Sequence, residues 1–126
     1  MINKLNTLYF SPTGTTAKVV TAVTKGISEG VVQNVYDITM PEGRKQKLSF
    51  TSEDFLVIGI PVYAGRVPEF ITPYLESLTG ERTHTILICA YGNRNYGDAL
   101  IELKDILQKN GCVIFAAGAF IGEHSY

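Results

Sequence analysis

The apolar positions of this chain fall into five short runs that predict β-strands. These runs are rich in Val, Ile and aromatic residues, and their hydrophobicity is nearly continuous rather than alternating. Strands that are buried on both faces, as in a parallel sheet, have this pattern. The predicted strands cover residues 5–10, 31–38, 55–60, 85–91 and 113–120.

Between several of these runs, apolar residues recur at the spacing of an amphipathic helix. The first predicted helix ends near Gly30, and Pro68 suits the first turn of the second helix, which Pro73 should kink or delay. Asp98 is placed to cap the third helix, and the Asn-Gly pair at 110–111 is placed to end it. The apolar stripes of these helices are Val20, Val23 and Ile27; Ile71, Tyr74, Leu75 and Leu78; and Ala99, Leu103, Ile106 and Leu107.

The alternation of strands and helices predicts a doubly wound α/β architecture. A chain of 126 residues is sufficient for one domain with its own core, so we expect residues 1–126 to form a single domain. Residues 39–54 show no helical pattern and are expected to form a loop with at most one turn. The basic run at 44–47 within this loop is typical of a solvated connector.

The segment between the first strand and the first helix contains the most informative signal in the chain. Ser11, Thr13, Thr15 and Thr16 surround Gly14 directly before the helix. The first N–H groups of a helix have no partner within it, and the helix dipole favours an anion there. A helix cap needs fewer hydroxyl groups than this. The pattern therefore predicts a phosphate site, in which the hydroxyls donate hydrogen bonds and Gly14 allows close approach.

Several other phosphate-binding motifs are absent from the sequence. It has neither the Gly-x-x-x-x-Gly-Lys motif of nucleoside-triphosphate loops nor a Gly-x-Gly-x-x-Gly dinucleotide fingerprint after the first strand. Cys89 and Arg94 are one residue too close together for a Cys-x5-Arg phosphatase loop. A loop that holds phosphate with hydroxyls and amides suits a tightly held cofactor better than a phosphate that must react.

The loop at 11–16, Ser-x-Thr-Gly-x-Thr, resembles the phosphate loop of the flavodoxins. Segments 59–68 and 91–98 resemble the two loops that enclose the flavin in that family. Thr15 stands where flavodoxins usually have Asn, but it keeps a hydrogen-bond donor. The resemblance covers residues 3–126 and is closest to flavodoxin-like domains that precede an iron–sulfur ferredoxin module. It implies a five-stranded parallel sheet of order 2-1-3-4-5, with FMN as the cofactor.

The resemblance also implies which residues contact FMN. Tyr63 and Tyr96 would stack on the two faces of the isoalloxazine ring, whereas Tyr91 is expected to end its strand. The peptide between Ala64 and Gly65 would lie beside flavin N5 and change orientation on reduction; a turn glycine with a fixed positive φ is the alternative. The implied contacts are Ser11, Thr13, Gly14, Thr15 and Thr16; Pro61, Val62, Tyr63, Ala64, Gly65 and Arg66; and Tyr91, Gly92, Asn93, Asn95, Tyr96, Gly97 and Asp98.

Arg66 and Arg94 lie in loops where flavodoxins commonly carry acidic residues. We expect one of them to lie near flavin N1 and O2, where it would stabilise the anionic hydroquinone; the alternative is that both point to solvent. The net charge is only −1, with 11 basic and 12 acidic residues, whereas flavodoxins that move between partners tend to be strongly acidic. A near-neutral chain suits a redox partner that is covalently attached, such as a ferredoxin-type iron–sulfur module.

The remaining reactive residues form no recognisable site. Cys89 and Cys112 are expected to be buried free thiols, which is consistent with a reducing cytoplasm. His84 begins a strand and is expected to be structural, and we do not expect His124 to handle protons. No metal-ligand spacing, signal peptide or membrane span is visible, and we expect neither nucleic acid nor a membrane as a partner.

The sequence ends shortly after the fifth predicted strand, where flavodoxins have a final helix over the sheet. We expect that helix to be missing, which would leave one face of the sheet partly uncovered beside the first and fifth strands. A domain cut from a longer chain is the favoured explanation. The alternative is that another subunit covers this face, as in a dimer.

We therefore expect an FMN-binding, flavodoxin-type electron carrier rather than a turnover enzyme. One alternative is an NAD(P)H-dependent flavin or quinone reductase on the same fold, although no additional loop is available to hold a nicotinamide. Another is a domain that binds no flavin and serves as an interaction surface. A receiver-type signalling domain is disfavoured, because residues 10–11 and 61–62 stand where that class needs acidic residues.

Overall fold

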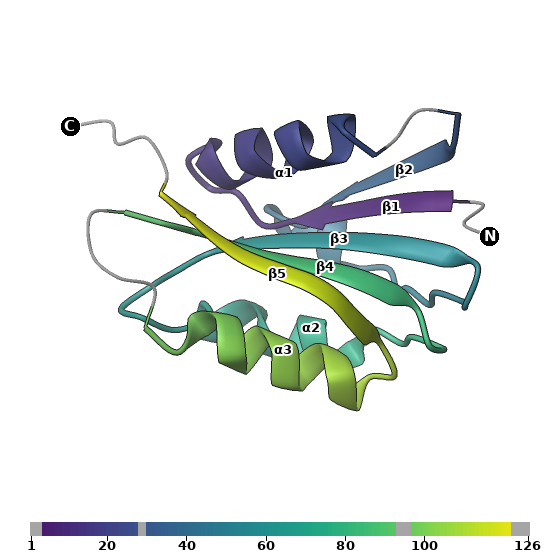
Figure 1. Ribbon diagram of the computed structural model, residues 1–126. Coiled ribbons are helices and arrows are strands. Elements are labelled where there is room, and N and C mark those ends of the chain that lie inside the picture. The colour runs from purple at the N-terminus through teal and green to yellow at the C-terminus, as the bar shows by residue number, and fades with distance from the viewer. Residues whose placement is uncertain (1–3, 28–29, 93–96, 122–126) are drawn as a thin grey trace.

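A parallel β-sheet lies between two layers of helices in the computed structural model, which describes residues 4–27, 30–92 and 97–121 (Figure 1). In chain order the elements are β1 (Lys4–Tyr9), α1 (Thr15–Lys25), β2 (Val32–Asp37), the 3₁₀ helix η1 (Pro41–Arg44), β3 (Asp54–Pro61), the 3₁₀ helix η2 (Glu69–Ile71), α2 (Thr72–Ser77), β4 (His84–Tyr91), α3 (Ala99–Lys109) and β5 (Val113–Ile121). The sheet has five strands in the order β2-β1-β3-β4-β5, as predicted.

The doubly wound α/β prediction is confirmed. Helix α1 covers one face of the sheet, and α2 and α3 cover the other face (Figure 1). Strand β1 pairs in parallel with both β2 and β3, so the strand order reverses at β1. Because every neighbouring pair is parallel, the carboxyl ends of all five strands lie at one edge of the sheet.

The core consists of two apolar clusters, one on each face of the central strand β3. Leu56, Ile58 and Ile60 belong to the cluster beneath α2 and α3. Phe55 and Val57 belong to the cluster beneath α1. Since both faces of β3 are buried, its sequence is hydrophobic almost without interruption.

Helix α1 comes particularly close to the sheet at Gly59 of β3. A Cβ atom on Gly59 would collide with Val20 Cγ2 and would lie 3.2 Å from Thr16 Cγ2. Because Thr16 lies in the first turn of α1, this contact fixes the beginning of the helix above the end of β3.

Two helix boundaries depend on details that periodicity does not resolve. Helix α1 ends at Lys25, so the predicted end near Gly30 is wrong, and Ile27 lies outside the helix and is 42% exposed. The apolar period continues past Gly26, which is the C-cap residue of α1. Pro73 delays the second helix as expected, because a 3₁₀ turn comes first and Pro73 occupies the first turn of α2.

The other boundaries agree with the prediction. Asp98 is the N-cap residue of α3, although its side chain makes no capping hydrogen bond, and Asn110 is the C-cap. The loop at 39–54 contains a 3₁₀ turn, as expected. Arg44 is the exception in the basic run of that loop, because it is half-buried and donates two hydrogen bonds to backbone carbonyls.

Strand β5 is largely exposed. Phe115 and Ile121 are 67% and 69% exposed. Phe115 packs edge to face on Phe55, which places it on the α1 side of the sheet, where no helix covers it in the part of the chain that the structure describes. The uncovered face expected beside the fifth strand is present. The same expectation for the first strand is wrong, because β1 is buried.

Candidate functional site

Three loops leave the carboxyl edge of the sheet beside the point where the strand order reverses. They follow β1, β3 and β4, and with the last residues of β3 and β4 they include the predicted contact residues at 11–16, 61–66, 91–92 and 97–98. In open α/β sheets, ligands bind outside the carboxyl ends of the strands at this position. The topology therefore brings the described residues of the three predicted segments to one edge.

The loop between β1 and α1 is a tight turn that is partly closed by its own hydrogen bonds. Gly14 has a φ of 86°, and its N–H donates to the Ser11 carbonyl at 3.2 Å. The N–H of Ala17 donates to Ser11 Oγ at 2.9 Å, so this hydroxyl caps the first turn of α1. Two N–H groups near the beginning of the helix are therefore already occupied.

The four hydroxyl side chains predicted to bind phosphate lie at different depths. Ser11 and Thr16 are buried, with exposed fractions of 9% and 2%, and the Thr16 methyl group faces Gly59. Thr13 and Thr15 lie nearer the surface, with their hydroxyl oxygens 3.4 Å apart. An anion above the loop would meet the hydroxyls of Thr13 and Thr15 before the other two.

Thr39, which follows β2, supports this loop and was not predicted from the sequence. The N–H of Ser11 donates to Thr39 Oγ1 at 2.9 Å. Thr39 is itself held by its neighbours, because its N–H donates to Asp37 Oδ1 at 2.9 Å and its carbonyl accepts a hydrogen bond from Arg44. The Asp-x-Thr spacing at the end of a strand is typical of an Asx turn, but it does not identify Ser11 as the partner.

The loop after β3 contains a two-residue turn between Tyr63 and Arg66. These residues exchange both backbone hydrogen bonds, each at 2.9 Å. The two residues between them, Ala64 and Gly65, have φ values of 51° and 78°, as in a type I′ turn. Tyr63 is 44% exposed. Gly65 thus has the positive φ of a turn glycine, and a change of orientation of the Ala64–Gly65 peptide stays a prediction.

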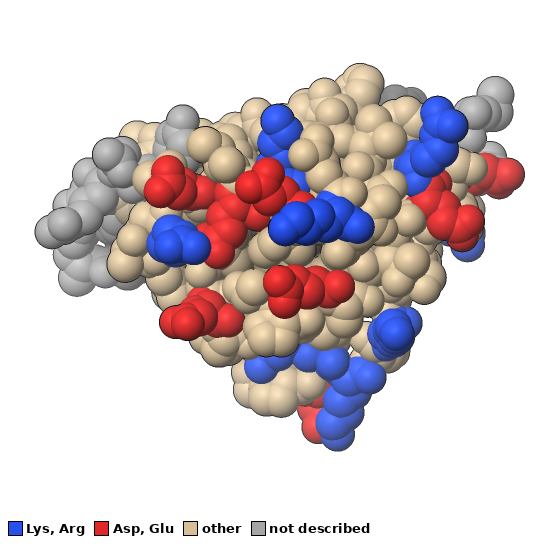
Figure 2. Space-filling model, turned by 90° about the horizontal axis from the view of Figure 1, so that it is seen from below, with Lys and Arg blue, Asp and Glu red and all other residues tan. Residues whose placement is uncertain are grey.

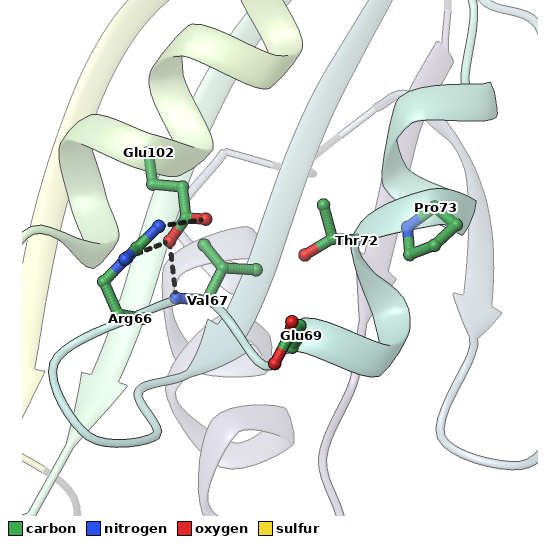
Figure 3. A pocket seen from close by; sticks show the side chains of 6 residues that line it. All are labelled: Arg66, Val67, Glu69, Thr72, Pro73 and Glu102. Carbon is green, nitrogen blue, oxygen red and sulfur yellow. Dashed lines mark hydrogen bonds and ion pairs between the residues drawn. The ribbon is translucent and has the colours of Figure 1, made fainter.

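Residues before and within α3 join the loop after β4 to this turn. The N–H of Asp98 donates to the Gly65 carbonyl at 2.9 Å. Gly97 lies against the same residue, since a Cβ on Gly97 would be 2.7 Å from the Gly65 oxygen. Glu102 accepts two hydrogen bonds from the Arg66 guanidinium, at 3.0 and 3.1 Å, and one from the Val67 N–H at 2.9 Å (Figure 3).

Glu102 is the second supporting residue that the sequence did not reveal. The hydrogen bond from Arg66 lowers the pKa of Glu102 below its usual range; burial opposes this shift and the Val67 N–H reinforces it. The same hydrogen bond raises the pKa of Arg66. Arg66 therefore does not simply point to solvent, because its charge is paired with a carboxylate of α3. Its expected place near flavin N1 and O2 stays a prediction.

A cavity of about 430 Å³ lies behind the 63–66 turn, toward α2 and α3. Of the predicted flavin contacts, only Arg66 is among its lining residues, so it is not the predicted flavin site. Figure 2 shows acidic and basic side chains interspersed on the face that carries α2 and α3. The cavity is lined by Arg66, Val67, Glu69, Thr72, Pro73 and Glu102 (Figure 3).

Several predicted residues cannot be placed in this arrangement. Asn93, Arg94, Asn95 and Tyr96 lie outside the described residues, and so does His124. Pro61 ends β3, Tyr91 ends β4 as expected, and Gly92 follows it. The second stacking tyrosine and the second arginine therefore stay predictions.

The cysteines agree with the sequence prediction. Cys89 and Cys112 are buried free thiols, and burial raises the pKa of Cys89 to about 12 and also raises that of Cys112. Among the residues that the structure describes, no group of His, Cys, Asp and Glu could hold a metal ion. None of the helices in this part of the chain is long and apolar enough to cross a membrane.

Several solved structures are similar to this chain in fold. No protein-family model matches the chain, and no curated protein matches its sequence. A flavodoxin of Streptococcus pneumonia TIGR4 has a TM-score of 0.69 at 11% identity, over 97% of this chain and 88% of that one. The Flv1 flavodiiron core of Synechocystis sp. PCC6803 has a TM-score of 0.68 at 17% identity. The match covers 94% of this chain, which spans only 30% of the Synechocystis protein.

A flavodoxin of Fusobacterium nucleatum, in a structure with flavin mononucleotide bound, matches with a TM-score of 0.64 at 15% identity, over 90% of this chain and 69% of that one. Together with the strand order, these similarities decide the fold class. The fold is flavodoxin-like. At such low identities the similarity is one of fold, and the cofactor and activity of a flavodoxin-like chain depend on its own residues.

Proposed function

We propose that this chain binds FMN at the carboxyl edge of β1, β3 and β4 and transfers electrons through it. The observation that carries the proposal is the loop at 11–16, a hydroxyl-rich turn that begins α1 beside the strand-order reversal. In that role Thr13 and Thr15 donate to the phosphate from the surface of the loop. Ser11 and Thr16 act from beneath by shaping the loop and anchoring α1.

The loop fits a phosphate group in both shape and charge. A Cβ on Gly14 would have no heavy atom within 4 Å, so the space beside the turn is open. Residues 11–16 contain no carboxylate that would repel an anion. The positive end of the α1 dipole adds to this attraction.

The second and third loops supply the ring side of the proposed site. Tyr63 is exposed at the turn that follows β3, where its ring is available for stacking on a flat aromatic cofactor. Tyr96 is proposed as the opposite wall. The remaining proposed ring contacts are Pro61, Val62, Ala64, Gly65, Arg66, Tyr91, Gly92, Asn93, Asn95, Gly97 and Asp98. The bound flavin would supply the one-electron chemistry, while the protein binds and orients it.

The proposed partner is a redox protein or a ferredoxin-type iron–sulfur module on the same polypeptide. A net charge of −1 supports attachment over long-range attraction, since charge steering needs a large field of one sign. The interspersed charges on the α2–α3 face support the same choice (Figure 2).

The proposal is tested by titrating the protein with FMN and with riboflavin and following flavin fluorescence. We expect FMN to bind much more tightly than riboflavin, because only FMN has the phosphate. Loss of a hydrogen bond to a charged group costs about 1.5–3 kcal/mol, so Thr13→Val should weaken FMN binding roughly tenfold or more and leave riboflavin binding unchanged. Thr21→Val, an exposed threonine later in α1, is the matched control.

Two results would contradict the proposal. Equal affinity for FMN and riboflavin would show that the loop holds no phosphate, and no binding of either would favour a domain without a flavin. If FMN binds, mixing the complex with NADPH distinguishes the carrier from a reductase. Rapid bleaching of the bound flavin without a partner protein would favour the reductase.

A further inference from the structure

Glu102 connects α3 to the segment that forms the ring side of the proposed site. Its carboxylate accepts a bidentate pair of hydrogen bonds from Arg66 and a third from the backbone N–H of Val67 (Figure 3). Arg66 is the last residue of the turn that begins at Tyr63, and Val67 directly follows it. The Glu102 side chain is 23% exposed, whereas that of Arg66 is 62% exposed, so the carboxylate is the more enclosed partner.

A second connection closes a ring of contacts around the turn. Gly65, inside the turn, accepts a hydrogen bond from the Asp98 N–H, and the Asp98 carbonyl accepts one from the Glu102 N–H, both at 2.9 Å. Gly97 lies against Gly65 so closely that a side chain on Gly97 would not fit. The 63–66 turn is thus held by Asp98, which precedes α3, and by Glu102, which lies in the first turn of that helix.

The 63–66 turn depends on polar contacts of this kind because little apolar packing supports it. Tyr63 is exposed, Ala64 has a positive φ that L-residues disfavour, and a cavity lies behind the turn. Val67 is the first residue after the turn that is buried in the core. Without Glu102, the N–H of Val67 and the guanidinium of Arg66 would both lose their acceptor.

We infer that Glu102 is a positioning residue of the flavin site, which holds the 63–66 turn where it can support the isoalloxazine ring. This role rests on the proposed FMN function and deepens it. Glu102 acts through Arg66 and Val67 and does not touch the cofactor. An exposed ion pair alone contributes little, but here the carboxylate also orders the backbone next to a turn in which Ala64 has a disfavoured positive φ.

The inference predicts a specific effect on the ring and not on the phosphate. Glu102→Ala should weaken FMN and riboflavin binding by the same factor, about tenfold, and should reduce the visible circular dichroism of the bound flavin. Glu102→Gln keeps an acceptor for Val67 but loses the ion pair, so it should give an intermediate effect. Glu76→Gln is the matched control, because Glu76 is an exposed glutamate of α2 that lines a second cavity together with Glu102 and makes no hydrogen bond or ion pair within the part of the chain that the structure describes.

A second readout needs no flavin. In the apo protein, Glu102→Ala should speed hydrogen exchange at the Val67 and Asp98 amides, while exchange in β3 should stay as in the wild type. Far-ultraviolet circular dichroism at the titration temperature shows whether each variant is folded, and Glu102→Gln supplies the comparison if the alanine variant is not.

The outcomes separate this inference from the proposed function. If the wild type binds FMN and both Glu102 variants bind it equally well, the positioning role is overturned and the proposed function stands. Weaker binding of FMN alone, with riboflavin unaffected, also overturns it, because Glu102 would then act on the phosphate side. A wild type that binds neither flavin overturns both.

Discussion

Ser11 is joined to two separate elements through two of its polar groups. Its N–H donates to Thr39 beyond β2, and its hydroxyl accepts the N–H of Ala17 in α1. Thr39 is fixed in turn by Asp37 and Arg44. The shape of the proposed phosphate loop therefore depends on a residue that lies 28 positions further along the chain.

The first prediction concerns this dependence. Thr39→Val removes the hydroxyl but keeps the size of the side chain, and it leaves the Ser11 N–H without its acceptor. An unsatisfied, partly buried donor costs about 1–3 kcal/mol, so we expect a loss of stability of that order. We also expect the preference for FMN over riboflavin to fall roughly tenfold. The lost hydrogen bond no longer holds the phosphate loop in its binding conformation, and about 1.4 kcal/mol corresponds to a factor of ten in affinity.

The measurement is a pair of fluorescence titrations combined with urea unfolding. Thr39→Ser keeps an acceptor oxygen and should behave like the wild type. An unchanged ratio of the two flavin affinities in Thr39→Val would show that Ser11 holds its position without Thr39.

At the residue scale, the sequence predicts the hydroxyls of the proposed phosphate loop but not the residues that hold the loops in place. The hydroxyls at 11–16 were recognised because they stand together in the chain and precede a helix. Thr39 and Glu102 were missed, since their partners lie 28 and 36 residues away and only the folded topology brings them together. A lone threonine after a strand and a lone glutamate on a helix carry no local signal.

Among the elements, α1 packs particularly closely on the sheet at Gly59. Gly59 lies opposite Val20 and Thr16, and a side chain at this position would collide with Val20. Thr16 is in the first turn of α1, so the height of the helix above β3 also sets the position of the phosphate loop. The packing of α1 on β3 therefore determines the geometry of the proposed phosphate loop.

The second prediction tests that coupling. Gly59→Ala should push α1 away from β3, and overpacking of this kind costs about 1–3 kcal/mol. We expect the midpoint of urea unfolding to fall and FMN binding to weaken, because the phosphate loop moves with the helix. Gly26→Ala is the control, as a Cβ there would meet only an ordinary contact of 3.6 Å with the Val23 carbonyl oxygen. A Gly59→Ala protein as stable as the wild type would mean that Val20 adopts another rotamer at no cost.

The elements were predictable to the extent that burial determines them. β3 and β4 lie in the middle of the sheet, so their continuous hydrophobicity indicated both their position and their parallel pairing. β5 has a similar composition but is exposed. Its exposure could not be predicted, because composition does not reveal whether a helix covers a strand. The end of α1 was placed too late because Ile27 continues the apolar period without lying in the helix.

For the whole molecule, β5 is an edge strand of the sheet and is largely exposed. The strand has nine residues, and none of them is charged or proline. Native sheets usually protect an edge strand with charges, proline or a covering element, and an exposed apolar edge favours pairing with another chain. The β5 strands of two copies can pair antiparallel across a two-fold axis, because each strand then meets the same strand of the other copy.

The third prediction is that the isolated chain associates with a second copy through β5. In sedimentation equilibrium, the average mass of the wild type should rise from monomer toward dimer as the concentration increases. Phe115→Lys places a charge in the middle of the exposed apolar face and should keep the protein monomeric. Ile101→Lys is the matched control, because Ile101 is 62% exposed on α3, which covers the opposite face of the sheet from Phe115, and its substitution should leave the association unchanged. A wild type that stays monomeric at every concentration, or two variants that reduce the mass equally, would exclude β5 as a dimer interface.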